Sequence, residues 1–328
     1  MKPFKPPIPP WKPDETCPCG NSSLALKDCC LGVDGIIRLA VPELLPPGPV
    51  TGFGHPKCYL NPTNDCCTKI SGEHVITRNV LTALSGKIEF FGLPWVSSGQ
   101  AQLIGVDTLK SNILCRRHNS ALSPLDSAAG NLFRALQTIC EDISPRNKSL
   151  SRRGKWSLVS GEAIELWGLK TLFGLYHAKF VTEGNARATL PAGLDVNLLL
   201  SALRQRHVSH PCGLYLRAMS GQAILNVDEK ISVTPLGSED KRRLTGIRIG
   251  MNAFEFEIIL DPTGVNFAAL ATEAVYHPWR LSFRNRLRHD NLVITWADTT
   301  NFGLTAEFTT EPVRAVARAA KRQAASPT

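Results

Sequence analysis

Most of the ten cysteines of this chain lie in two patches, each with the composition of a zinc site. The first patch reads CPCGNSSLALKDCC and brings Cys17, Cys19, Cys29 and Cys30 close together in the chain. Four thiolates can complete a tetrahedral Zn²⁺ site, and the metal then supplies folding free energy that so short a segment cannot obtain from a hydrophobic core. Because four protein ligands leave no open position, this patch predicts a structural zinc.

The second patch combines cysteines with a histidine. HPKCYLNPTNDCC supplies Cys58 with Cys66 and Cys67, and ILCRRHN further along supplies Cys115 and His118. Thiolate and imidazole ligands from two distant loops can bind one Zn²⁺ and tie those loops to one scaffold. Only one of the adjacent cysteines is needed; we take Cys67 as the ligand and keep Cys66 as the alternative. The two patches together predict two structural zinc ions.

The first patch resembles the SEC-C zinc motif. Cys17-Pro18-Cys19-Gly20, Lys27 and Cys29-Cys30 match its pattern, whereas Asn21-Ser22-Ser23 replaces the usual Ser-Gly-Lys and the spacer is one residue longer. The resemblance implies a small zinc knuckle. It also implies a surface at which a protein partner can bind, although the departures leave the identity of that partner open.

The second patch and its surroundings resemble the zinc-stapled branch of the HNH endonucleases, which have a ββα-metal core. The residues that carry this resemblance are Gly72-Glu73-His74-Val75-Ile76, Asn112 and Cys115-Arg116-Arg117-His118-Asn119, within residues 58–126. The sequence departs from the family pattern in the wide spacing of the first zinc pair, in His118 for a cysteine and in Thr77 for a proline. None of these departures removes the residues of the catalytic motif.

This second resemblance implies a metal-dependent endonuclease that hydrolyses phosphodiester bonds. In such an enzyme His74 is the general base, a role that suits an imidazole because its pKa lies near neutrality. Glu73 and Asn119 hold one Mg²⁺ or Mn²⁺ through oxygen, and Asn112 supports the His74 region. The alternative is a non-catalytic zinc adaptor that binds protein or nucleic acid, in which His74 is an ordinary structural histidine.

The charge of the chain agrees with a polyanionic partner. The net charge is +9 and basic residues occur in clusters, one of which contains Arg116 and Arg117. The HNH resemblance implies that these two arginines contact a nucleic acid backbone, with DNA as the expected substrate. The strand WRLSFRNRLR is a second candidate, because alternation places Arg280, Arg284, Arg286 and Arg288 on one face.

The composition also indicates where the protein acts. The N-terminal segment has no apolar signal region, and no stretch approaches the roughly 20 apolar residues that span a bilayer. Cysteines that cluster beside histidine fit metal binding in a reducing compartment better than disulfide bonding. We therefore expect a cytoplasmic protein without a membrane partner.

The expected fold class is α+β, with 43% hydrophobic residues in 328, enough for more than one domain. A proline-rich tail (1–16), the knuckle (17–32) and a linker (33–54) precede the HNH-like core (55–145) and a C-terminal α+β domain with a mostly antiparallel sheet (155–328). Apolar periodicity predicts helices from Ser123 and over 161–177, 194–207 and 312–323. Alternation and turn residues predict strands at 213–220, 222–227, 230–236, 244–250, 253–260, 279–288 and 291–296.

Overall fold

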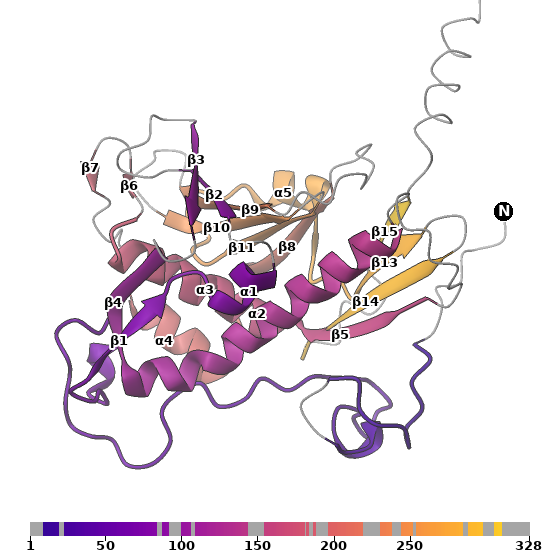
Figure 1. Ribbon diagram of the computed structural model, residues 1–328, viewed down its shortest axis with the longest axis horizontal. Helices are drawn as coiled ribbons and strands as arrows, with labels where there is room; N and C mark the ends of the chain where they lie inside the picture. The colour runs from indigo at the N-terminus through magenta and orange to yellow at the C-terminus, as the bar shows by residue number, and fades with distance from the viewer. Residues whose placement is uncertain are drawn as a thin grey trace, which may run out of the picture.

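The computed structural model (Figure 1) describes residues 9–19, 23–83, 87–91, 100–105, 109–143, 154–180, 182–183, 186–187, 196–218, 230–237, 244–251, 254–284, 288–297 and 305–309. Its helices and its mostly antiparallel sheets confirm the predicted α+β class. The strand predicted at 222–227 and the helix predicted at 312–323 lie outside the described residues.

Two antiparallel strands and a long helix form the unit that carries the predicted site. β1 (Ile70–His74) pairs with β4 (Lys110–Cys115), and α2 (Arg116–Ile143) begins at the residue after β4. The ββα order implied by the resemblance is thus present. Three elements are inserted between its strands, namely α1 (Arg78–Ala83), β2 (Lys87–Phe91) and β3 (Ala101–Gly105).

Helix α2 begins seven residues earlier than predicted and crosses the middle of Figure 1. Ser123 and Pro124 suggested a helix start, but both lie inside the helix. Proline has no N–H to donate to the carbonyl four residues earlier, which here belongs to Ser120. The Ser123 hydroxyl donates to that carbonyl instead, at 2.8 Å. The prediction of the start was therefore wrong, because a local side chain replaces the missing hydrogen bond.

A seven-stranded sheet has the order β12-β8-β11-β10-β9-β2-β3 among the described residues. Its neighbours are antiparallel except for β2 and β9. Strands from residues 55–145 and from residues 155–328 therefore lie in one sheet. The strands of the later stretch are β8 (Gly213–Ala218), β9 (Lys230–Gly237), β10 (Leu244–Met251), β11 (Phe254–Ile259) and β12 (Ala274–Tyr276).

Helix α3 (Gly161–His177) lies at the centre of the molecule and confirms the helix predicted there. Its residues from Gly161 to Leu175 are all buried, because α2 covers one side and the large sheet the other. No described helix combines the length and the apolar character needed to cross a bilayer. The other short elements are α4 (Val196–Gln205), α5 (Phe267–Glu273), β6 (Thr182–Glu183) and β7 (Ala186–Arg187), with 3₁₀ turns at Leu26–Asp28 and Asn61–Thr63.

A four-stranded sheet supports the N-terminal knuckle. Its order is β15-β13-β14-β5, with β5 (Trp156–Ser160), β13 (Arg280–Arg284), β14 (His289–Thr295) and β15 (Thr305–Thr309). Three of the knuckle cysteines, Cys17, Cys19 and Cys30, share a hydrophobic cluster with Leu158 and Val293 of this sheet. Trp11 packs edge-on against Trp156, with ring centroids 6.0 Å apart. The knuckle is therefore docked on the body of the protein.

The basic face predicted for residues 279–288 is wrong for the arginines whose side chains are described. Arg280 is fully buried, and Arg288 is buried in ion pairs with Asp142 and Asp290. Both sides of this strand are covered, so simple alternation could not place the arginines in solvent.

Candidate zinc centres and the Glu73 cluster

The four cysteines of the first predicted zinc centre come together in the structure. The sulfur atoms of Cys17, Cys19, Cys29 and Cys30 all lie within 4.8 Å of one another. The Cys19 and Cys29 sulfurs are 3.7 Å apart, and those of Cys29 and Cys30 are 3.6 Å apart. Sulfur ligands of a tetrahedral Zn²⁺ lie about 3.8 Å apart, given Zn–S bonds of about 2.3 Å. The donor set and its spacing therefore fit one zinc ion.

The second centre gathers Cys58, Cys66, Cys115 and His118, all buried and with ligand atoms within 4.8 Å of one another. His118 Nδ1 lies 3.2 Å from the Cys115 sulfur and 3.6 Å from each of the other two. Its Nε2 lies 3.1 Å from the Thr63 hydroxyl, a contact that would orient the ring and leave Nδ1 to the metal. Burial lowers the pKa of His118, which favours the neutral form that binds metal.

The structure corrects the choice between the adjacent cysteines. Cys66 joins the second centre, whereas Cys67, the predicted ligand, does not. The Cys67 sulfur accepts the backbone N–H of Arg117 at 3.4 Å and lies at the start of α2. Consecutive side chains of an extended segment point to opposite sides, so only one of the pair can face the centre.

Glu73 and Asn119 meet in a buried cluster that includes a cation absent from the prediction. Lys170 Nζ of α3 lies 2.6 Å from Glu73 Oε1 and 2.7 Å from both oxygens of Asp126. Asn119 donates to the Ser71 hydroxyl at 2.8 Å and hydrogen-bonds to Glu73. Two carboxylates and one ammonium leave this Glu73 cluster with a formal charge of −1.

The electrostatics of the cluster keep Lys170 charged. Burial acts to lower the pKa of Lys170, but Asp126 and Glu73 together raise it above its ordinary value. Burial also raises the pKa of Glu73, although Lys170 opposes that effect. In this arrangement the Lys170 ammonium is paired with the Glu73 carboxylate, which was expected to bind Mg²⁺. Glu73 and Asn119 therefore do not fit a divalent ion while Lys170 is paired.

His74 and Asn112 lie away from the Glu73 cluster. His74 is half-buried, ends β1 and pairs with Lys110 of β4. Since it follows Glu73 directly in the strand, its side chain belongs to the opposite face. Asn112 is exposed on β4. The structure therefore unites two of the predicted catalytic residues, Glu73 and Asn119, and separates the other two from them.

The two arginines at the start of α2, Arg116 and Arg117, differ in their exposure and in their contacts. Arg116 is exposed, as a phosphate contact requires. Arg117 Nε and Nη2 bind the oxygens of Asp65 at 3.0 and 3.2 Å, and Nη2 also donates to the carbonyls of Pro47 and Pro49. Arg117 thus holds the segment before the second centre in place, and its contact with nucleic acid stays a prediction.

Sequence reasoning missed the partner of Lys170. Glu165, the nearest acidic residue before it in α3, is five residues away and so does not share a helix face with Lys170. Glu165 accepts from the Leu214 N–H at 2.6 Å and lies 2.7 Å from His277 Nε2. A lysine inside a helix of mostly apolar residues was the available signal that a buried anion lies nearby.

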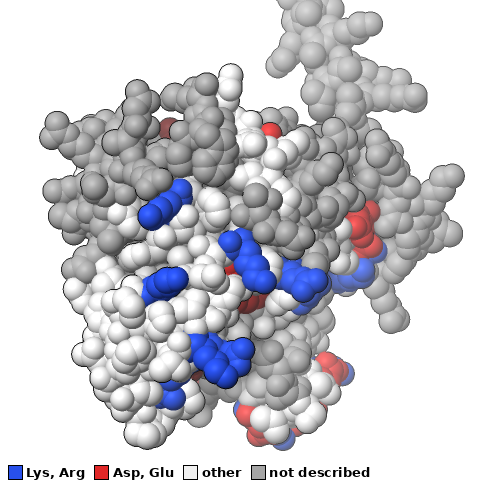
Figure 2. Space-filling model, turned by 60° about the vertical axis from the view of Figure 1, so that its left-hand side comes forward, with Lys and Arg blue, Asp and Glu red and all other residues white. Residues whose placement is uncertain are grey.

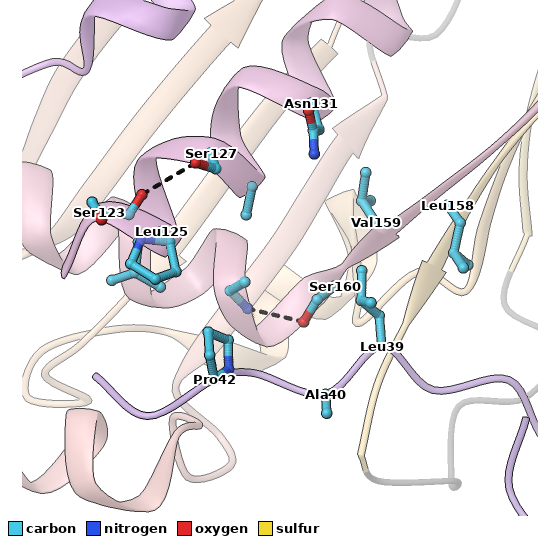
Figure 3. A pocket seen from close by; sticks show the side chains of 13 residues that line it. Leu39, Ala40, Pro42, Ser123, Leu125, Ser127, Asn131, Leu158, Val159 and Ser160 are labelled. Carbon is cyan, nitrogen blue, oxygen red and sulfur yellow. Dashed lines mark hydrogen bonds between the residues drawn. The ribbon is translucent and has the colours of Figure 1, made fainter. Parts of the chain in front are cut away.

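A separate hollow of about 420 Å³ lies between α2, β5 and the segment 39–42 (Figure 3). Ser123, Ser127 and Asn131 line it from α2, and Ser160, which caps α3, lines it from β5. None of the described residues that line it has an ionisable side chain, so these residues offer neither a general base nor a metal ligand.

Comparisons of the chain with models of known protein families, with curated proteins and with solved structures gave no match. The geometry of the two zinc centres and of the Glu73 cluster therefore carries the functional argument.

Proposed function

We propose that this protein is an HNH-type endonuclease that hydrolyses phosphodiester bonds in nucleic acid, with DNA as the expected substrate and His74 as the general base. The observation that carries the proposal is the ββα unit. Its second candidate zinc centre ties the loop before β1, the strand that carries Glu73 and His74, to the first turn of α2, which carries Asn119.

In this mechanism His74 accepts a proton from water, and the resulting hydroxide attacks the scissile phosphorus. The bond to the leaving oxygen breaks, and that oxygen takes up a proton. A half-buried imidazole at the end of β1 is accessible enough for this exchange. Zinc in either centre takes no part, since every ligand position is filled by the protein.

Charge on the phosphate requires a cation. A divalent ion, when bound by Glu73 and Asn119, would supply that stabilisation. Binding there requires Lys170 to leave Glu73, because one carboxylate oxygen already contacts its ammonium. The proposal therefore implies a competition between Lys170 and the divalent ion.

The decisive experiment is a cleavage assay on plasmid and single-stranded DNA with Mg²⁺ or Mn²⁺. Wild-type protein should cut, and His74→Ala should lower the rate by about 10² to 10⁴ fold with an unchanged zinc content. His207→Ala removes an exposed histidine and serves as the control. Equal cleavage by His74→Ala and wild type would remove His74 from its role.

The second candidate is a non-catalytic zinc adaptor. It is favoured by Lys170, which neutralises the expected metal ligand, and by the placement of Glu73 and His74 on opposite faces of β1. An adaptor should retain both zinc ions and bind its partner but cut no nucleic acid with any divalent ion. The same assay, with zinc analysis of the same sample, separates the two candidates.

A further inference from the structure

An open groove of about 980 Å³ lies beside the ββα unit, on the side of β4 that carries Asn112. Three lysines line it from three segments: Lys57 precedes the second zinc centre, Lys110 starts β4, and Lys179 follows α3. Ser111 and Asn112 add polar groups, and none of the described residues that line the groove carries a carboxylate. Figure 2 shows this side of the molecule, where Lys and Arg side chains spread over the face and most acidic ones lie near its margins.

These lysines differ from others in the chain. Lys12, Lys27 and Lys155 each lie within 4.0 Å of a carboxylate. By contrast, Lys57, Lys110 and Lys179 form no ion pair with any carboxylate in the described part of the chain. His177 in the groove adds no charge at neutral pH, since burial lowers its pKa to about 4. The positive charge of the groove is thus uncompensated, as a site for an external anion requires.

Lys110 connects the groove to His74. The two residues are directly opposite each other in the β1–β4 pair, which places their Cβ atoms about 5 Å apart. The Lys110 side chain also lies across Gly72, where a Cβ would clash with its Cε. Gly72 therefore leaves the space in which the Lys110 side chain lies along β1, on the face of the strand pair that also carries His74.

Lys179 occupies a backbone position that favours glycine. Its φ of 62° is left-handed, and its N–H donates to the Tyr176 carbonyl just beyond the end of α3. A residue with a Cβ is strained there, and glycine is the usual choice after a helix. A lysine in this place costs stability and contributes a charge to the groove.

We infer that the groove binds the phosphate backbone of a nucleic acid strand through Lys57, Lys110 and Lys179 and so leads it toward His74. This inference rests on the proposed function in that it takes His74 as the general base. The binding itself requires no cleavage.

The test is the affinity of the full-length zinc-loaded protein for a labelled single-stranded and a labelled duplex oligonucleotide, without added Mg²⁺ or Mn²⁺. The variant Lys57→Gln/Lys110→Gln/Lys179→Gly should bind at least about tenfold more weakly at low salt. Its slope of log affinity against log salt should be shallower by about 0.7 to 0.9 for each lysine that contacts a phosphate. The control Lys12→Gln/Lys27→Gln/Lys155→Gln removes the same charge elsewhere and should change both quantities little.

The single variant Lys179→Gly adds a readout that separates binding from folding. It should weaken binding while its Tm stays the same or rises, because glycine relieves the left-handed strain. Equal affinity and salt dependence of wild type and the groove variant, or equal losses in groove and control variants, would overturn the inference. Weaker binding by the groove variant alone would support it even if the wild type cleaves nothing, an outcome that rejects only the proposed nuclease activity.

Discussion

At the scale of single residues, the Lys170 ammonium has the largest energetic role in the candidate site. Its side chain is 4% exposed and contacts two carboxylates that belong to β1 and α2. A buried charge is tolerated only when it is paired, so each member of the cluster depends on the others. The cluster therefore joins α3 to the ββα unit by charge as well as by packing.

Replacing Lys170 by methionine should lower the free energy of unfolding by about 3 to 5 kcal/mol, because Glu73 and Asp126 then lose their cation. Urea denaturation measures this loss. The double variant Lys170→Met/Glu73→Gln should recover part of it, since one unpaired carboxylate has been removed. Full stability of Lys170→Met would mean that the ion pairs are not formed in solution.

The raised pKa of Glu73 predicts that the stability of the folded protein depends on pH. A carboxyl group whose folded pKa exceeds its unfolded value of about 4.3 binds protons more tightly in the folded state. Its contribution to stability is therefore present below about pH 4 and is lost as the pH rises through the folded pKa. The unfolding free energy of the wild type, relative to that of Glu73→Gln, should therefore fall as the pH rises above about 4 and passes through the folded pKa of Glu73. A difference that moves the other way would show that Lys170 outweighs burial at this carboxyl.

At the scale of elements, α3 is held very close to the large sheet. A Cβ at Gly168 would clash with the Cδ1 atom of Ile258 in β11, so a larger residue at this helix position would force the Ile258 side chain to move within the core. The helix tolerates the residue because tertiary contacts outweigh its low helix propensity.

Gly168→Ala should therefore destabilise the protein by about 1 to 3 kcal/mol, although alanine is the better helix former. Ile258→Val removes the clashing methyl group, so the double variant should lose less stability than the two single variants combined. Denaturation of the wild type, the two single variants and the double variant gives the coupling free energy between the two substitutions. Strict additivity would show that the helix and the strand do not meet at this point.

At the scale of the whole molecule, one hydrophobic core joins segments far apart in the sequence. Ile88 of β2 lies in the same core as Ile231 of β9, and Leu44 from the segment 33–54 is fully buried in it. The knuckle packs on a different surface, the four-stranded sheet. The two zinc centres are thus expected to contribute to stability in different ways.

Metal analysis should return about two zinc equivalents for each chain, since each closed set of four ligands binds one ion. Cys17→Ser should reduce this to about one and leave the main core folded, because the knuckle is docked at its surface. Cys115→Ser should instead unfold the ββα unit, whose second centre is buried in the main core. A wild-type stoichiometry near one would show that one of the two ligand sets is wrong.

Local pattern determined much of this protein. Cysteine and histidine spacing was enough to locate both candidate zinc centres, apart from the choice between Cys66 and Cys67. The periodicity of apolar residues was enough to find α3, α4 and the strands from β8 to β11, because an amphipathic face is determined by residues that are near one another in the chain. Only the tertiary structure decided that Cys66 faces the second centre, that Arg280 is buried and that Lys170 neutralises Glu73. Each of these depends on which distant segment covers a given side chain, and burial and pairing across the fold are set by the packing of the whole chain.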